Sequence, residues 1–154
     1  MLGLIEKLKI ASRNRTTYRV GLLQAKAFRI LKNHTDDALS KHAISNVDWV
    51  FLGLLHDNIN GLRLKEMAEE LGVEAPFVTS LFNKLEKINL VTSRVDTFDS
   101  RAKNIQLTSR GHTFVIATEE YLKDKMKKLL VGAGKSDLLS YVTVLEKIIE
   151  NSKE

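Results

Sequence analysis

The sequence predicts a mainly α-helical fold with one small β-hairpin, and three observations support this prediction. Apolar residues recur at three- and four-residue spacing over most of the 154 residues, as they do on the buried face of an amphipathic helix. The chain contains a single proline, and proline interrupts helices. Alternation of apolar and polar residues, which is typical of a half-buried strand, marks two short stretches between residues 90 and 107. The length fits a single domain over residues 1–154.

The N-terminal part of the chain is expected to be helical. Apolar spacing predicts a short helix over residues 2–11 and a long helix from Thr17 to Lys41. The long helix has apolar residues on more than one side, which predicts packing against several neighbours. These residues are Tyr18, Leu22, Ala25, Phe28, Leu31 and Leu39, with Val20, Leu23, Ala27 and Ile30 beside them.

A third helix is predicted to begin after Ser45. Ser45 and Asp48 stand three residues apart and resemble a capping box, with aspartate in place of the usual glutamate. Apolar residues at helical spacing continue this helix to Leu55. The stretch from Asp57 to Gly61 (DNING) then has the composition of a turn.

Two short helices joined by a tight turn are predicted next, from apolar residues at helical spacing over residues 64–71 and again over residues 78–85. Gly72 suits the left-handed position that ends a helix, and Pro76 suits the first turn of the following one. The second helix is expected to bury one apolar stripe, made of Val78, Leu81, Phe82 and Leu85. This layout is that of a helix-turn-helix, although a helical hairpin in any helical protein has it too.

A β-hairpin is predicted directly after the second of these helices. Leu90–Val95 (LVTSRV) and Asn104–Leu107 (NIQL) alternate apolar and polar residues, and the stretch between them, Asp96–Lys103, is polar. A hairpin in this position is the wing of a winged helix-turn-helix. The predicted fold class is therefore mainly α with a small β-hairpin wing, carried between N- and C-terminal helices.

Two further helices are predicted after the hairpin. Thr108 or Ser109 is expected to cap a long helix that ends near Leu130, and the stretch VGAGKS is expected to form a loop. Ser136 is expected to cap the last helix, which continues to about residue 151.

Composition favours a polyanionic partner and argues against several other functions. The formal net charge is +5 at pH 7 and the pI is about 9.4, which favours attraction to phosphate. The chain has no cysteine, so disulfides, cysteine nucleophiles and cysteine-ligated metals are excluded. The sequence has no Gly-rich phosphate loop, H-E-x-x-H motif or nucleophile elbow, so we do not expect an enzyme. It has no run of about 18 apolar residues either. We expect a cytoplasmic protein without membrane contact or cofactor.

A series of short motifs follows in fixed order between Leu71 and Gly111. They are Leu71-Gly72, Val78-Thr79, Leu85-Glu86, Leu90-Val91, Arg94, Asp99-x-Arg101, Ile105-x-Leu107-Thr108 and Gly111. In this order the motifs resemble those of the multiple-antibiotic-resistance regulator (MarR) family. The resemblance implies a sequence-specific transcriptional regulator that binds double-stranded DNA, and we expect a repressor.

The second helix of the helix-turn-helix is the expected recognition helix, because a helix fits the major groove. Asn83 suits adenine, and Phe77 suits a thymine methyl group. The candidate contacts on this helix are Pro76, Phe77, Thr79, Ser80, Asn83 and Lys84. Family members often have arginine or lysine at the position of Ser80, so this helix is less basic than usual. The alternative is an ordinary solvated helix face.

Charged residues of the hairpin are expected to extend this contact. Arg101 is the strongest single candidate, because a wing can place a guanidinium group in the minor groove. The resemblance implies that Asp99 orients Arg101 without contacting DNA. Arg94 and Lys103 are expected to lie near phosphates. Solvated side chains are the alternative for Arg94, Arg101 and Lys103.

The terminal helices are expected to form a separate lobe. Residues 45–108 would make up the DNA-binding lobe, and residues 1–44 and 109–154 a helical dimerisation lobe. The resemblance implies a twofold homodimer whose recognition helices lie ~34 Å apart and bind a pseudo-palindromic operator.

A small-molecule effector is the other partner that the resemblance implies. Such a ligand would bind between the lobes and shift the spacing of the recognition helices. The residues considered for its pocket are Tyr18, Phe28, Trp49 and His112, for which ordinary core positions are the alternative.

Two other functions remain open at this point. A winged-helix protein that dimerises or binds a partner protein would not bind DNA, and the less basic recognition helix keeps this alternative open. A metal-responsive regulator would need a site such as His42 and His112 with a nearby carboxylate. Surface or interface histidines are the simpler explanation, so no metal site is predicted.

Overall fold

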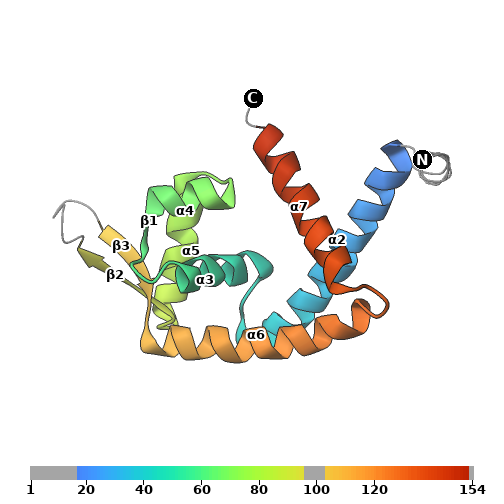
Figure 1. Cartoon of the computed structure of the whole chain (residues 1–154). Helices are drawn as coiled ribbons and strands as arrows, with labels where there is room; N and C mark the ends of the chain where they lie inside the picture. Colours follow the sequence, from blue (N-terminus) through green and yellow to red (C-terminus); the bar gives the residue numbers. More distant parts are fainter. Residues whose placement is uncertain (1–16, 96–102, 153–154) are drawn as a thin grey trace, which may run out of the picture. The chain divides into compact units, whose positions relative to one another are not determined.

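The mainly helical architecture is confirmed by the computed structural model, which describes residues 17–95 and 103–152 (Figure 1). The chain divides into two compact units, one ending at Glu120 and the other beginning at Tyr121. The predicted helix over residues 2–11 lies outside the described residues. The elements are α2 (Thr17–Leu39), the 3-10 helix η1 (Ser40–His42), α3 (Asn46–Asp57), β1 (Leu62–Arg63), α4 (Leu64–Leu71), α5 (Ala75–Lys87), β2 (Val91–Val95), β3 (Lys103–Leu107), α6 (Ser109–Leu129) and α7 (Lys135–Asn151).

The start of α3 confirms the predicted capping box. The Asp48 N–H donates to Ser45 Oγ at 3.3 Å, and Asp48 Oδ2 accepts from the Ser45 N–H at 2.8 Å. Each residue thus satisfies a backbone group or side chain of the other, and the two fix where the helix begins.

The turn between α4 and α5 forms as the sequence predicts. Gly72 adopts a left-handed conformation with φ of 64°, and the Val73 N–H donates to the Ala68 carbonyl at 3.1 Å. These are the features of a Schellman stop. At the other end of α4, the Glu66 carboxylate accepts from the Arg63 N–H at 2.8 Å. Glu66, three residues after the N-cap, therefore satisfies the backbone N–H of Arg63, although Arg63 stands where a serine or threonine cap is usual.

The sheet has three strands, so the prediction of two was incomplete. Its order is β1-β3-β2, and both pairings are antiparallel. In β1, Leu62 lies opposite Ile105 and Arg63 opposite Asn104. A two-residue strand has no alternation that a sequence pattern could reveal, and it exists because β3 offers a free edge. The start of the helix-turn-helix is thereby fixed to the wing.

The lobe formed by α3–α5 and the sheet has a continuous apolar core. The predicted stripe of α5 is buried in full, with exposed fractions from 0% at Val78 and Leu85 to 9% at Phe82. Side chains of α3 meet this core from another side. Its buried members include Phe51, Leu52, Leu55, Met67, Leu90, Val91, Ile105 and Leu107.

Thr108 and Gly111 join the wing to the start of α6. The Thr108 hydroxyl donates to the Asn89 carbonyl at 2.8 Å and accepts from the Gly111 N–H at 3.0 Å, so Thr108 is the cap of α6. A Cβ atom at Gly111 would lie 2.0 Å from the Leu90 carbonyl oxygen. Only glycine allows this close approach of two backbones, which gives a physical reason for the Leu-Thr-x-x-Gly motif.

The start of α7 differs from the prediction that Ser136 caps it. The N-cap is Gly134, two residues earlier, and the Asp137 carboxylate accepts from the Gly134 N–H at 2.8 Å. Ser136 therefore lies inside the first turn. A glycine can occupy the N-cap because a carboxylate three residues later satisfies its N–H.

Apolar residues of α2 and α7 are largely exposed. Tyr18 and Phe28 of α2 are 77% and 61% exposed, so the expectation that this helix packs on several sides is not met among the residues that the structure describes. Ala38 and Leu39, at its C-terminal end, are buried. None of the helices described is long and apolar enough to cross a membrane.

Candidate nucleic-acid interface

The recognition helix α5 separates its apolar and polar residues onto two faces. The buried stripe lies on one face, and Pro76, Thr79, Ser80 and Asn83 are exposed at the complementary spacing. Phe77 is 45% exposed beside them. The structure therefore brings these five predicted contact residues together on the solvent side of a single helix.

The N-terminal end of α5 suits an anion. Its N-cap residue, Glu74, makes no side-chain capping hydrogen bond, and Pro76 occupies the first turn. N–H groups at the start of a helix and the helix dipole both favour a phosphate. Within the first turns, the Thr79 hydroxyl donates to the Ala75 carbonyl at 3.0 Å. This leaves the hydroxyl oxygen as an acceptor toward a ligand.

Lys84 forms an ion pair that the sequence did not reveal. Its ammonium group is bound to the Asp48 carboxylate of α3. The Asp48 side chain is 0% exposed, whereas the Lys84 side chain is 46% exposed. The capping pattern placed Asp48 at a helix start and the helical periodicity placed Lys84 on α5. Asp48 and Lys84 are separated by 36 positions in the sequence, and no local pattern spans that separation, so the pairing could not be seen.

The wing places one of its predicted contact residues on the described surface. Arg94 of β2 is exposed and lies opposite Asn104. The backbone of Lys103 pairs with Val95. Asp99, Arg101 and the side chain of Lys103 lie outside the described residues.

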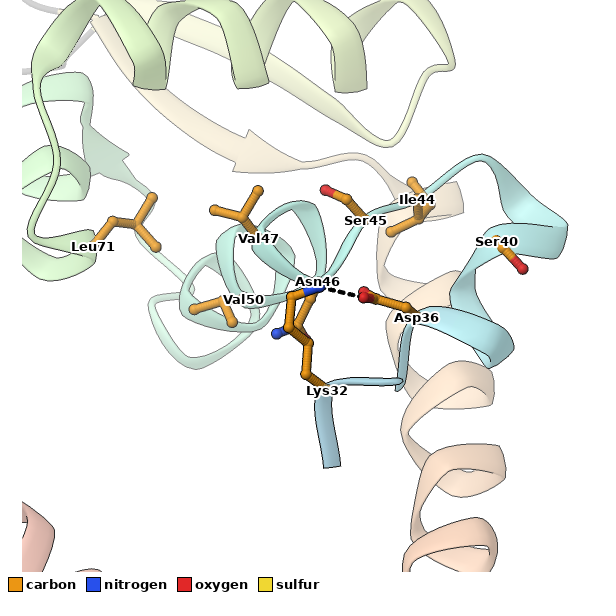
Figure 2. A pocket seen from close by; sticks show the side chains of 9 residues that line it. All are labelled: Lys32, Asp36, Ser40, Ile44, Ser45, Asn46, Val47, Val50 and Leu71. Atoms are coloured by element: carbon orange, nitrogen blue, oxygen red, sulfur yellow. Dashed lines mark hydrogen bonds and ion pairs between the residues drawn. The ribbon is translucent and has the colours of Figure 1, made fainter. Parts of the chain in front are cut away.

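A pocket of about 590 Å³ lies beside the N-terminus of α3 (Figure 2). Lys32 and Asp36 of α2 form an ion pair at its edge. None of the four residues considered for an effector pocket lines this pocket. The residues that do are Lys32, Asp36, Ser40, Ile44, Ser45, Asn46, Val47, Val50 and Leu71.

The two histidines considered for a metal site have different neighbours. The His42 ring lies 5.3 Å from the Phe114 ring, and the His112 ring lies 5.9 Å from the His56 ring, measured between centroids. Among residues 17–95 and 103–152, the side chains form no group of three or more histidines and carboxylates suited to a metal ion. The arrangement of these histidines therefore adds nothing in favour of a metal-responsive regulator.

Comparison with known proteins identifies relatives of this architecture. The sequence model of the MarR family matches residues 44–103, which contain α3, α4, α5, β1 and β2. The DNA complex of MepR from S. aureus has 26% sequence identity and a TM-score of 0.72, over 89% of this chain and 99% of MepR.

Two further solved structures extend this comparison. The transcriptional regulator PA3341 has 28% identity and a TM-score of 0.75, over 87% of this chain and 98% of PA3341. CouR from Rhodococcus jostii RHA1, solved with p-coumaroyl-CoA, has 19% identity and a TM-score of 0.77. It covers 84% of this chain and 90% of its own, and at this identity it supports the fold alone. The similarity thus extends well beyond residues 44–103 to the helices on both sides.

Proposed function

We propose that the chain is a transcriptional regulator of the MarR family that binds double-stranded DNA as a homodimer, as its similarity to the family model and to solved regulators supports. One observation carries this proposal: α5 buries its whole apolar stripe and presents a polar face directly after a tight turn. A helix placed in this way can enter the major groove. The similarity to MepR, solved with DNA, supports the same function.

Each exposed residue of α5 has a proposed role. Asn83 can form two hydrogen bonds with adenine, and Phe77 can contact a thymine methyl group. Thr79 and Ser80 can bond to bases or phosphates, and Pro76 lies at the helix end that favours a phosphate. In this proposal the helix reads sequence mainly through neutral contacts, since its exposed N-terminal face has no basic residue.

The wing supplies the charge in this proposal. Arg94 and Lys103 lie near phosphates, and Arg101 enters the minor groove with its orientation set by Asp99. A phosphate contact adds affinity on every sequence, whereas a guanidinium group in a narrow minor groove also responds to groove width. The wing therefore contributes affinity and sensitivity to DNA shape.

Exposed apolar side chains support the proposed homodimer. In α7, Leu139, Tyr141, Val144, Ile148 and Ile149 are each at least half exposed. Apolar surface of this extent usually marks an interface. A second copy is the occupant proposed, with residues 1–44 and 109–154 as dimerisation lobe and residues 45–108 as DNA-binding lobe. Twofold symmetry would then match a pseudo-palindromic operator, which the regulator would occupy as a repressor.

A small-molecule effector is a further part of the proposal. The pocket at the start of α3 has apolar walls and a charged edge, and Ser45 belongs both to its lining and to the cap that holds Asp48. A ligand there would act on the same residues that fix α3. Benzoate, benzamidine and benzyl alcohol would test the pocket by chemical shift changes, with Val50→Trp as a variant that fills it. Equal changes in the variant would contradict binding in this pocket.

The DNA-binding proposal is tested by fluorescence anisotropy on duplexes selected from a random-sequence pool, at two salt concentrations. We expect affinity for the selected duplex to exceed that for a scrambled one and to fall steeply with salt. Absence of duplex binding after selection would contradict the proposal. The chain would then be a winged-helix module that binds a protein, which the lack of basic residues on the exposed N-terminal face of α5 would favour.

Asn83→Ala is the sharpest variant for this test. We expect it to weaken binding to the selected duplex by about tenfold or more, because one bidentate base contact contributes ~1–3 kcal/mol of discrimination. Binding to the scrambled duplex should change little. Asn151→Ala, the same change at the end of α7, is the control and should leave both affinities as they are.

A further inference from the structure

The ion pair between Asp48 and Lys84 connects the start of α3 to the recognition helix. Asp48 Oδ2 accepts from the Ser45 N–H at 2.8 Å and from the Ser45 hydroxyl at 2.6 Å, and it also binds the Lys84 ammonium. The other oxygen, Oδ1, is buried and has no hydrogen-bond partner. The carboxylate is thus enclosed on the protein side, and its charge is compensated by a group from α5.

A buried carboxylate strongly favours a partner of opposite charge. Removing it from water is costly unless a cation and hydrogen bonds replace its hydration. Ser45 supplies neutral donors, and Lys84 is the one cation paired with it among the described residues. Leu85, next to Lys84 on the helix, is buried, whereas Asn83 on its other side is exposed. The ion pair directs the Lys84 ammonium group toward the start of α3.

This geometry conflicts with a role for Lys84 at the DNA backbone. A lysine that contacts a phosphate must release its ammonium group into solvent between α5 and the duplex. Here that release would leave a charged carboxylate buried without its cation, which is unfavourable. A lysine ammonium has three donors, so it can have more than one partner. Its position is set by the least mobile of them, which here is Asp48, held by Ser45 at the start of α3.

We infer that Lys84 is a positioning residue: with Asp48 it fixes the orientation of α5 toward DNA and does not itself contact a phosphate. This inference rests on the proposed function and assigns a different role to one of its candidate residues. Asp48 shares the role, although it lies outside the DNA-facing surface. Both act through Asn83 and the other exposed residues of α5, because a small rotation of the helix moves all of these side chains together.

The two roles of Lys84 predict different salt dependence. Removing one phosphate contact lowers the slope of log K against log salt by about 1 and weakens binding to all sequences alike. Removing a positioning residue leaves the slope unchanged, because no counterion release is lost. It reduces the preference for the selected duplex over the scrambled one instead.

The test uses the full chain with Lys84→Met, Asp48→Asn and the double variant. The double variant removes both charges together, so it stays informative even if Lys84→Met alone does not fold. We expect its preference for the selected duplex to fall about tenfold with an unchanged salt slope. Lys84→Arg should restore the preference, and Lys87→Met removes a charge from the same helix as a control. A slope lowered by about 1 with unchanged preference would overturn the inference.

The ion pair itself is tested without DNA, which separates this inference from the proposed function. Thermal unfolding of the wild type, both single variants and the double variant gives a double-mutant cycle. We expect the two substitutions to be strongly non-additive, with the double variant more stable than Lys84→Met. Additive effects would overturn the inference. Absence of duplex binding by the wild type would contradict the proposed function. It would also contradict the part of the inference that concerns the orientation of α5 toward DNA.

Discussion

Helix α3 and helix α7 are both rich in apolar residues, but they use them differently. Phe51 and Leu52 of α3 are 0% exposed, whereas Leu139 and Ile148 of α7 are 59% and 55% exposed. In α3 the buried apolar residues, Phe51, Leu52 and Leu55, meet a core made by the same chain. Among the described residues, most apolar side chains of α7 are exposed, so apolar content alone does not indicate where the core lies.

This difference separates a part of the molecule that forms its core within a single chain from a part that exposes apolar residues. The winged-helix lobe has its caps, turn and core within residues 44–111, so its stability should depend little on concentration. Exposed helices such as α7 depend on a partner, and their contribution should appear as association. The following variants test this distinction, from the largest expected effect to the smallest.

Gly111→Ala should give the largest loss of stability. Its Cβ would lie 2.0 Å from the Leu90 carbonyl oxygen, so either α6 or the start of β2 must move. We expect unfolding to become easier by more than about 3 kcal/mol, at the upper end of the cost of overpacking. Urea denaturation measures this change.

Gly53→Ala is the matched control for that experiment. A Cβ at Gly53 would meet nothing within 4 Å, and alanine in a helix is favoured by ~0.5–1 kcal/mol over glycine. We therefore expect slight stabilisation. A Gly111→Ala protein as stable as the wild type would show that the joint between wing and α6 is not tight.

Leu52→Ala and Leu139→Ala compare the same substitution in the two regions. Leu52→Ala should reduce the free energy of unfolding by about 3 kcal/mol at every protein concentration, because it leaves a cavity in the core. Leu139→Ala should instead weaken self-association, measured by sedimentation equilibrium. If Leu139→Ala left association unchanged while the protein remained dimeric, α7 would not be part of the interface.

Ser45→Ala should have an intermediate effect within the lobe. It removes the hydroxyl that accepts from the Asp48 N–H and donates to the Asp48 carboxylate. Loss of such a cap costs ~1 kcal/mol, which a shift of the urea midpoint measures. Ser136→Ala is the control in α7, where the N-cap is Gly134, and it should not change stability.

Asp124→Asn should have the smallest effect. Lys127 donates a hydrogen bond to this carboxylate at 2.7 Å and, together with its charge, lowers the pKa of Asp124 below the ordinary value. The ion pair therefore stabilises the fold above the ordinary pKa, and this contribution is lost as pH falls through the lowered pKa. Both side chains are exposed, so Tm at pH 7 should remain within error of the wild type. A clear decrease would show that this exposed pair stabilises the fold more than such pairs usually do.

Local features of the fold could be predicted from the sequence because short stretches determine them. Ser45 with Asp48, Gly72, and the stripe from Val78 to Leu85 each depend on residues within one or two turns of a helix. The motif from Thr108 to Gly111 could be identified by resemblance, and its physical reason is the approach of the Leu90 carbonyl. These features define the lobe and the exposed face of α5.

Other features depend on contacts between distant residues and could not be predicted in this way. The short strand β1 exists only because Ile105 and Asn104 provide an edge for it. The pairing of Asp48 with Lys84 joins α3 and α5. The apolar periodicity of one helix does not indicate which residues of the other helix it contacts. Exposure of Tyr18 and Phe28 could not be predicted either, because an apolar stripe looks the same whether its partner is this chain or another copy.

The central position of β3 has a consequence for how related proteins can diverge. β3 is bonded to β1 and to β2, and the paired positions run from Leu62 opposite Ile105 to Val95 opposite Lys103. The connection between Val95 and Lys103 can gain or lose residues without shifting any of these pairs. Insertions and deletions there would change the reach of the wing while the lobe keeps its shape. In this way, related proteins with the same scaffold would contact operators of different length.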